Sequence, residues 1–144
     1  MPTYAFSTAK ELTPQQRAKL VENVTDIHHV EAIAPRYFVQ VVFYKVEPDL
    51  IFIGGEAASH DHVWVRADIR SRRTKDQKAK MLRRIMREAS EILGISDQDV
   101  WVYISDIPAQ GVLEFRNVLP EPGDEEQWLA SLPSALRDKL KYTA

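Results

Sequence analysis

Residues 74–94 read TKDQKAKMLRRIMREASEILG, and this stretch decides the fold because the chain carries its pattern twice. Thr74 and Gln77 form a capping box, in which the hydroxyl and the amide side chain each satisfy a free backbone N–H at a helix start. Apolar residues then recur at helical spacing up to Gly94, which is typical of a helix stop. The pattern predicts an amphipathic helix between these signals.

A shift of 61 residues, from Thr13 to Thr74, lays the first half of the chain on the second. The apolar run 39–43 then falls on the run 100–104, so two copies of one strand–helix–strand unit are indicated. The helices are expected to start at the two capping boxes. Strands are expected at Thr3–Thr8, Tyr37–Val46, Val63–Ile69 and Val100–Ile104, with minor strands near Phe52 and at Val112–Phe115.

A strand–helix–strand crossover pairs its two strands in parallel. The duplicated units therefore predict an α/β domain of the α+β sandwich kind, with a four-stranded sheet and both helices on one face. Residues 1–144 are expected to form one domain, with the copies at about 2–61 and 62–120. The segment 121–144 is expected to be an arm that packs on the body or on a neighbouring chain.

Composition excludes several classes of protein. The 144 residues contain no cysteine, which excludes disulfides, thiol catalysis and cysteine-held metals, and favours a cytoplasmic protein. The most apolar run, 37–44, is far shorter than a membrane helix, and no signal peptide pattern precedes it. None of the five glycines lies in a phosphate-binding motif. Neither membrane nor nucleotide binding is expected.

Pro2 follows the initiator Met, whose removal leaves a secondary amine at the start of a strand. An α-amino group titrates near about 8, so this amine can act as a base or an acid near neutral pH. Proline after Met is common, so the alternative is that Pro2 has no function.

Arg70 and Arg73 lie just before the helix that starts after Thr74, where two guanidinium groups and free backbone N–H groups can converge on a carboxylate. The alternative is a solvated basic surface, because the whole segment 66–87 is rich in Lys and Arg. The same surface is the basis for a second alternative, nucleic-acid binding through phosphates. No RNA-binding aromatic motif accompanies it.

His28 follows Val21 and Val24 at helical spacing, so it is expected on the inward face of the first helix, with His29 pointing away. Such a histidine is a candidate for substrate contact, or it packs in the core and bonds to the backbone. His60 and His62 have a spacing that suits two metal ligands, but no further ligand is evident and a turn is favoured.

Two further polar residues interrupt apolar strands. Tyr103 stands where the first copy has Val42, and core packing is the alternative to a polar role. Glu114 lies within the apolar run 112–115, where apolar neighbours raise a carboxyl pKa toward values that suit proton transfer. On an exposed edge strand it is only a solubilising charge.

Several separated motifs occur together in this chain, namely Met-Pro at the start, Thr25-Asp26-x-His28, Arg70-x-x-Arg73, Trp101-Val102-Tyr103, Pro108-Ala109-Gln110, Glu114 and Leu119-Pro120-x-Pro122-Gly123. Together they resemble the tautomerase superfamily, specifically its cis-3-chloroacrylic acid dehalogenase branch and the hydratase-like homologues of that enzyme. The resemblance runs from Pro2 to about Leu132, and the internal duplication is also a feature of the family.

The resemblance implies an enzyme without metal or cofactor that acts on a small carboxylate substrate and assembles as a homotrimer. It implies addition of water to α,β-unsaturated acids, such as 3-haloacrylates and acetylenic acids, to give malonate semialdehyde-type products. Some family members then decarboxylate the product. A keto–enol tautomerase, in which Pro2 acts as a base, is the alternative within the family.

The resemblance also assigns roles to matching residues. The family proline matches Pro2 and protonates the carbon next to the carboxylate, which is bound by an arginine pair that matches Arg70 and Arg73. The assisting histidine of the family matches His28. In the family, a tyrosine and a glutamate position and deprotonate the attacking water. They match Tyr103 and Glu114.

This chain departs from the family pattern near the glutamate. Members commonly carry Tyr-Gly-Arg there, whereas this chain has Phe115-Arg116-Asn117, so the arginine has moved by one position. Segment 33–37, expected at the mouth of the pocket, resembles the hydratase-like homologues. These departures predict a hydratase-type site with weak or incidental dehalogenation.

Overall fold

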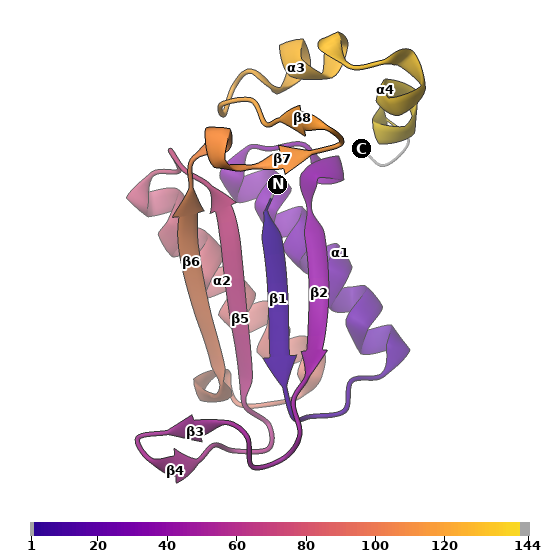
Figure 1. Cartoon of the computed structure of the whole chain (residues 1–144). Helices are drawn as coiled ribbons and strands as arrows, with labels where there is room; N and C mark the ends of the chain where they lie inside the picture. Colours follow the sequence, from indigo (N-terminus) through magenta and orange to yellow (C-terminus); the bar gives the residue numbers. More distant parts are fainter. Residues whose placement is uncertain (1, 142–144) are drawn as a thin grey trace.

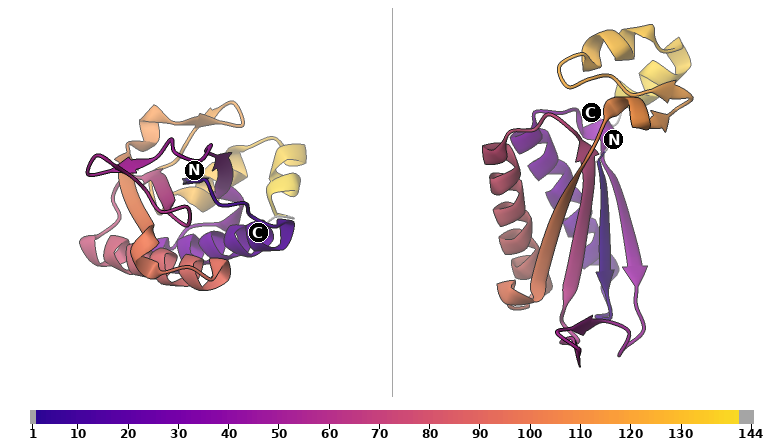
Figure 2. Two further views of the ribbon diagram at one scale, coloured as in Figure 1. Left: turned by 90° about the horizontal axis from the view of Figure 1, so that it is seen from below. Right: turned by 60° about the vertical axis from the view of Figure 1, so that its left-hand side comes forward.

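A computed structural model describes residues 2–141 and shows a two-layer sandwich of one sheet and two long helices (Figure 1). The sheet has the strand order β2-β1-β5-β6, in which β1 and β2 are parallel, β5 and β6 are parallel, and β1 and β5 are antiparallel. Both helices cover the same face of the sheet, as the right-hand view of Figure 2 shows. The predicted fold is confirmed. The main elements are β1 (Thr3–Thr8), α1 (Pro14–Ala32), β2 (Gln40–Lys45), β5 (Val63–Arg70), α2 (Lys75–Leu93) and β6 (Val100–Ile107).

The repeat extends further than the sequence pattern indicated. Both capping boxes form, at Thr13 and at Thr74, and both long helices start one residue later. The same 61-residue shift relates two short 3-10 helices, which precede β2 and β6, and two hairpins, which follow these strands. These elements are η1 (Arg36–Phe38) and η2 (Asp97–Asp99), hairpin β3–β4 (Phe52–Ile53 and Glu56–Ala57), and hairpin β7–β8 (Leu113–Glu114 and Asn117–Val118).

The core lies between the sheet and the two helices. Side chains alternate along β1, so that Tyr4, Phe6 and Thr8 are buried beneath the helices while the intervening residues face the other way. Val21 was expected on the inward stripe of α1, but its side chain is 38% exposed. Leu20 takes the inward place, because each helical residue is rotated by about 100° from the one before it.

The C-terminal arm packs on its own chain at one end of the sheet, where β1 begins and β5 and β6 end (Figure 1). It follows the short helix η3 (Ala109–Gly111) and hairpin β7–β8, and it contains α3 (Glu125–Ser131) and α4 (Ser134–Lys141). Pro133 separates these two helices, since proline suits a helix start and not an interior. No helix within residues 2–141 is long and apolar enough to cross a bilayer.

The two long helices end in the same left-handed backbone conformation but use different residues. Ile33 has a φ of 52° and Gly94, its counterpart in the second copy, has a φ of 65°. A side chain makes this conformation costly, whereas glycine adopts it freely. The Ile33 side chain is 78% exposed, so it gains little burial in return.

Replacement of Ile33 by Gly is therefore expected to raise the free energy of unfolding by about 0.5–1 kcal/mol, as measured by urea denaturation. Gly94→Ala is the matched control and should lower it, although an added Cβ meets nothing within 4 Å there. A destabilised Ile33→Gly variant would contradict this account of the helix end.

Candidate active site

Pro2 lies at the start of β1 and is fully buried. Its carbonyl accepts a hydrogen bond of 2.9 Å from the backbone N–H of Gln40, which ties the beginning of β1 to β2. The alternation along β1 places Pro2 on the same face as Tyr4. The predicted removal of Met1 concerns a residue outside the described ones.

His28 is buried on the inner face of α1, as the sequence predicted, and it contacts Tyr4. The Tyr4 hydroxyl lies 2.9 Å from Nδ1 of His28. Burial, and then the positive charges of Arg73 and Arg70, lower the pKa of His28 to about 3. Burial also raises the pKa of Tyr4, so its hydroxyl keeps its proton and can donate it to Nδ1. The imidazole is neutral, and when the Tyr4 hydroxyl donates to Nδ1 the ring proton is on Nε2.

Arg73 lies in the loop between β5 and α2, and only 9% of its surface is exposed. No acceptor among the described residues reaches its Nε atom. Burial and the neighbouring charge of Arg70 lower its pKa. A buried cation with an unfilled donor favours an anion at this position, because desolvation makes the unpaired charge costly.

Arg70, at the end of β5, is only 3% exposed and its guanidinium already has partners. Nη2 donates to Glu125 Oε1 at 2.5 Å, and Nη1 donates to the carbonyl of Pro120 at 2.6 Å. The guanidinium also lies 5.1 Å from the centre of the Phe38 ring. Both predicted arginines therefore reach the same end of the sheet, but they differ in what they contact.

The backbone between the two arginines is strained. Arg72 has a φ of 75°, in the left-handed region, and its side chain is 69% exposed. Its neighbours Arg70 and Arg73 are turned inward. Backbone strain of this kind persists where the surrounding structure requires it, as at ligand sites.

Glu114 is half-buried in β7, and hairpin β7–β8 lies over the end of the sheet where β1 begins (Figures 1 and 2). The hairpin turn consists of Phe115 and Arg116, with φ values of 51° and 66°. The first copy has Gly54 and Gly55 at these positions, which is the usual choice for such a turn. The shifted Arg116 thus occupies a left-handed position of the turn and is exposed.

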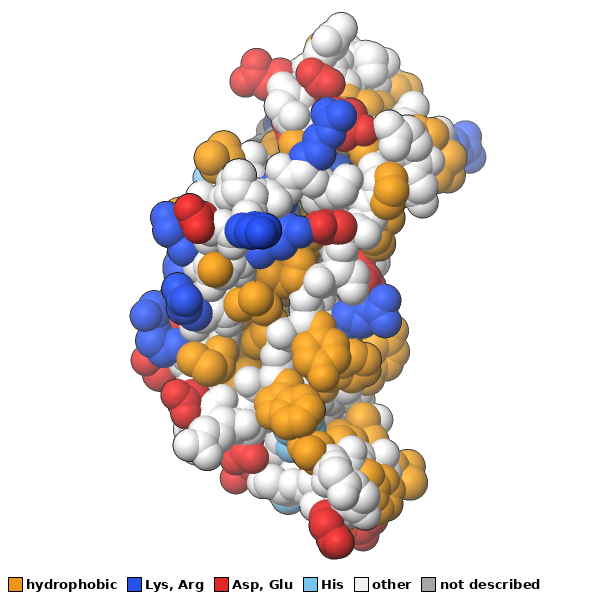
Figure 3. Space-filling view, turned by 90° about the vertical axis from the view of Figure 1, so that its left-hand side faces the viewer, with side chains coloured by type: hydrophobic (Ala, Val, Ile, Leu, Met, Phe, Trp, Pro, Cys, Tyr) orange, Lys and Arg blue, Asp and Glu red, His pale blue; other side chains and the backbone are white. Residues whose placement is uncertain are grey.

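Tyr103 does not join the other predicted residues within one chain. It lies on the face of the sheet that the helices leave uncovered, where it pairs in register with Arg66 and packs edge-on against Trp64 at 5.7 Å. A cavity of about 480 Å³ opens there, lined in part by Tyr103, Trp101 and Phe52. Figure 3, which views the molecule from the side of β6, shows hydrophobic side chains gathered over its lower half.

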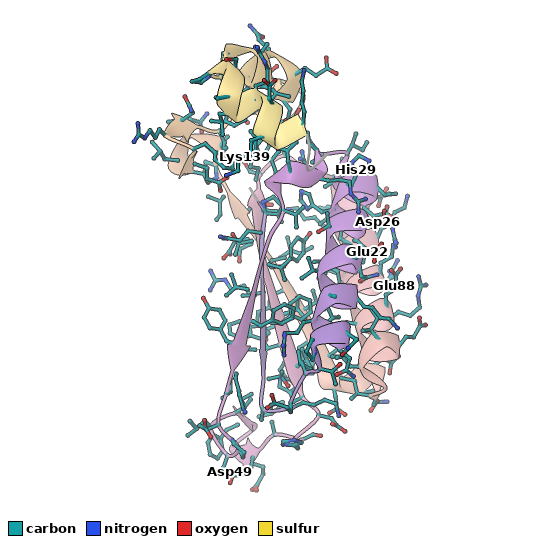
Figure 4. The ribbon with its side chains drawn as sticks, turned by 90° about the vertical axis from the view of Figure 1, so that its right-hand side faces the viewer. Glu22, Asp26, His29, Asp49, Glu88 and Lys139 are labelled. Carbon is teal, nitrogen blue, oxygen red and sulfur yellow. The ribbon has the colours of Figure 1, made fainter. Side chains whose placement is uncertain are left out.

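Most basic residues of segment 66–87 lie within 4 Å of a carboxylate oxygen. Arg84 lies between α2 and α1, within 4 Å of carboxylate oxygens of Asp26, Glu31 and Glu88. Figure 4 shows Asp26 and Glu88 on neighbouring helices, on the side away from the sheet. Acidic side chains also neutralise other members of the segment, namely Arg66, Arg70, Arg72, Lys78 and Arg87. This pairing reduces the positive charge that α2 offers to phosphates, although Lys75, Lys80 and Arg83 remain exposed.

No metal site is evident in the described part of the chain, where no three His, Cys, Asp or Glu side chains gather to hold an ion. His60 and Asp61 lie in a turn, as the sequence favoured. The end of the sheet where Arg70 and Arg73 lie is called the arginine end below. Two residues that the sequence did not single out contribute to it, Tyr4 and Glu125. Tyr4 was detectable as a polar group on an inward strand position, whereas nothing in the acidic stretch after Gly123 distinguished Glu125.

A duplicated strand–helix–strand sandwich, with a proline at the start of the first strand and two buried arginines beside it, defines a class of small tautomerase-like proteins. Residues 1–131 match a family model described as a putative oxalocrotonate tautomerase enzyme. The chain belongs to this family, within the tautomerase superfamily. The comparison with curated proteins found no match.

Solved structures support the same assignment. The chain is similar to N1, a member of the cis-3-chloroacrylic acid dehalogenase family, with 38% identity, a TM-score of 0.94, and coverage of 97% of this chain and 99% of that chain. It is also similar to native Ps01740, with 33% identity, a TM-score of 0.73, and coverage of 78% and 99%. A symmetric trimer of wild-type fused 4-OT shares the fold, with 21% identity, a TM-score of 0.75, and coverage of 83% and 97%.

The neutral state of His28 has a testable effect on stability. Its folded-state pKa of about 3 lies below the value of about 6.5 in an unfolded chain, so the unfolded chain binds a proton first as the pH falls. His28 therefore lowers stability as the pH drops below about 6.5, by up to about 1.4 kcal/mol per pH unit, until its folded-state pKa is reached.

In His28→Gln this contribution is absent, so the loss of unfolding free energy between pH 7 and pH 4 should be smaller than in the wild type. Urea denaturation of both proteins at the two pH values measures the difference. An equal loss in both would show that His28 titrates in the folded protein as it does in the unfolded chain.

Proposed function

We propose that this protein is an N-terminal-proline enzyme that adds water to small α,β-unsaturated acids without a cofactor. The observation that carries this proposal is the buried Arg73, whose Nε donor has no acceptor among the described residues. The charge of Arg73 acts on the neutral His28, and the charge of Arg70 acts on Arg73. A planar guanidinium matches a carboxylate, which it binds through two parallel hydrogen bonds. A small organic acid is the substrate class that suits this end of the sheet.

The arginines act on the charge that develops during the reaction. When water adds to the double bond, negative charge moves onto the substrate carboxylate as an enediolate. Buried donors that are already oriented stabilise this charge more than the charge of the ground state, which lowers the barrier. A neutral His28 with its proton on Nε2 can donate a further hydrogen bond without adding charge.

Pro2 and Glu114 handle the protons of the added water. Glu114 accepts a proton from the water whose oxygen bonds to the β-carbon, and the cationic amine of Pro2, free after removal of Met1, gives a proton to the α-carbon. A 3-halogen then leaves as halide from the same carbon that gained the hydroxyl, and the hydroxyl releases its proton to water as the C=O bond forms, which yields malonate semialdehyde. An acetylenic acid instead gives an enol that tautomerises.

The proposal includes assembly as a trimer, as the fused 4-OT structure is described. Trp101 and Tyr103 are 40% and 49% exposed on the open face of the sheet, and Phe52 of hairpin β3–β4, which lines the same cavity, is 60% exposed. An assembly would bury this apolar surface. Because Tyr103 faces away from Pro2 within one chain, a role for it in positioning water requires that another chain bring its Tyr103 to this site.

The first test is a proton NMR time course of Met-free protein with cis-3-chloroacrylate, propiolate and phenylenolpyruvate, with Pro2→Ala as the control. We expect malonate semialdehyde or acetaldehyde to form from the unsaturated acids in a Pro2-dependent way. Ketonisation of phenylenolpyruvate alone would instead make the protein a tautomerase that uses Pro2 as a base. Glu114→Gln should lose hydration, and hydration retained in this variant would contradict the proposed water activation.

The arginine loop offers a matched pair of variants. Arg73→Gln removes the buried donor and should lower kcat/KM for the unsaturated acid by about 100-fold or more. Arg72→Gln removes the same charge from a largely exposed neighbour and should change kcat/KM by less than about threefold. Similar losses in both variants would show that general charge, and not the Arg73 donor, attracts the substrate.

A further inference from the structure

Arg70 and Glu125 form a buried ion pair at the arginine end of the sheet. The two side chains are 3% and 10% exposed, and Nη2 of Arg70 lies 2.5 Å from Oε1 of Glu125. The second carboxylate oxygen, Oε2, accepts a hydrogen bond of 2.8 Å from the backbone N–H of Gly123. Although burial alone would raise the pKa of Glu125, the hydrogen bonds from Arg70 and the backbone lower it overall, so the carboxylate is charged.

Packing of the arm holds Glu125 in this place. Trp128, one turn further along α3, packs against Phe38 with ring centres 5.4 Å apart, and Phe38 itself lies against Arg70. Nε1 of Trp128 also donates to the carbonyl of Val118 at 2.9 Å. A substrate carboxylate that displaced the Glu125 side chain would have to break both its ion pair with Arg70 and its hydrogen bond from Gly123. Glu125 is therefore a fixed part of the site and does not leave when an acid binds.

The ion pair divides the work of the two arginines. Glu125 cancels the charge of Arg70 and occupies part of its donor fork, whereas Arg73 is paired with no carboxylate among the described residues and keeps an unfilled Nε donor. The arginine pair consequently presents one uncompensated positive charge and one guanidinium group, that of Arg73, with a donor open to a carboxylate. An acid with two carboxylates needs two such groups, and its second charge would meet the carboxylate of Glu125.

We propose that Glu125 is a specificity-determining residue that restricts the site to acids with a single carboxylate. The inference rests on the proposed function in that it takes the arginine pair as the substrate site. It goes further because it assigns the choice between monocarboxylates and dicarboxylates to a residue of the arm.

Calorimetric titration with butyrate and succinate tests the inference, because the two acids differ by one carboxylate. The wild type should bind butyrate at least as tightly as succinate. In Glu125→Gln the ratio of the butyrate Kd to the succinate Kd should rise by about tenfold, since the second cation becomes available. Glu126→Gln removes the same charge from an exposed neighbour in the same turn and should leave the ratio unchanged.

A merely structural role for Glu125 would lower the melting temperature without changing this ratio, so an unchanged ratio in folded Glu125→Gln would overturn the inference. An equal rise in Glu126→Gln would overturn it as well. The wild type alone decides the matter if Glu125→Gln does not fold, because succinate bound tenfold more tightly than butyrate contradicts a monocarboxylate site.

Binding does not require turnover, so the two proposals can fail separately. A wild type that binds butyrate but hydrates none of the unsaturated acids would overturn the proposed function and leave the inference standing. A wild type that binds neither butyrate nor succinate would overturn the inference directly.

Discussion

The burial of two guanidinium groups at one end of the sheet is the constraint on which the rest of this site depends. A buried cation is costly unless an anion or several acceptors compensate it. Glu125 and the Pro120 carbonyl compensate Arg70, and this requirement explains why the arm folds back over the sheet end. Arg73 has no such partner among residues 2–141, and its charge, with that of Arg70, helps to keep His28 neutral.

Strain gathers at the same end of the molecule. Four non-glycine residues there have left-handed backbone conformations: Ile33 at the end of α1, Arg72 beside the buried arginines, and the turn pair Phe115 and Arg116 above them. The corresponding turn of the first copy, far from this site, has two glycines. The duplicated copies are thus an internal comparison in which the fold is constant. At the hairpin turn the strained residues belong to the copy that carries Glu114 and the arginines, whereas at the helix end the first copy has Ile33 and the second has Gly94.

The fold was predictable from the sequence because its signals are local and occur twice. The capping boxes, the alternation in the strands and the stop at Gly94 each depend on neighbouring residues, and the structure confirms them. The arginine end was predictable only in part. The pairing of Arg70 with Glu125 joins residues 55 positions apart through an arm with no repeat partner, and no local pattern encodes it. The sequence placed Tyr103 on the correct strand, β6. It did not show that the side chain lies on the open face of the sheet, away from Pro2, because strand assignment alone does not say how a residue is placed relative to a site.

The duplication also explains why one chain has one such arginine site and not two. The first copy has Ala9 and Leu12 where the second has Arg70 and Arg73, and α2 has Ala89 where α1 has His28. Arginines at the opposite end of the sheet would need their own buried carboxylate, because each pair in this environment leaves an excess of positive charge. The chain has a single arm, and it lies over a single end of the sheet (Figure 1). An apolar residue at each position of the other end avoids the desolvation cost, so the absence of a second arginine pair follows from the same electrostatics that maintain the first.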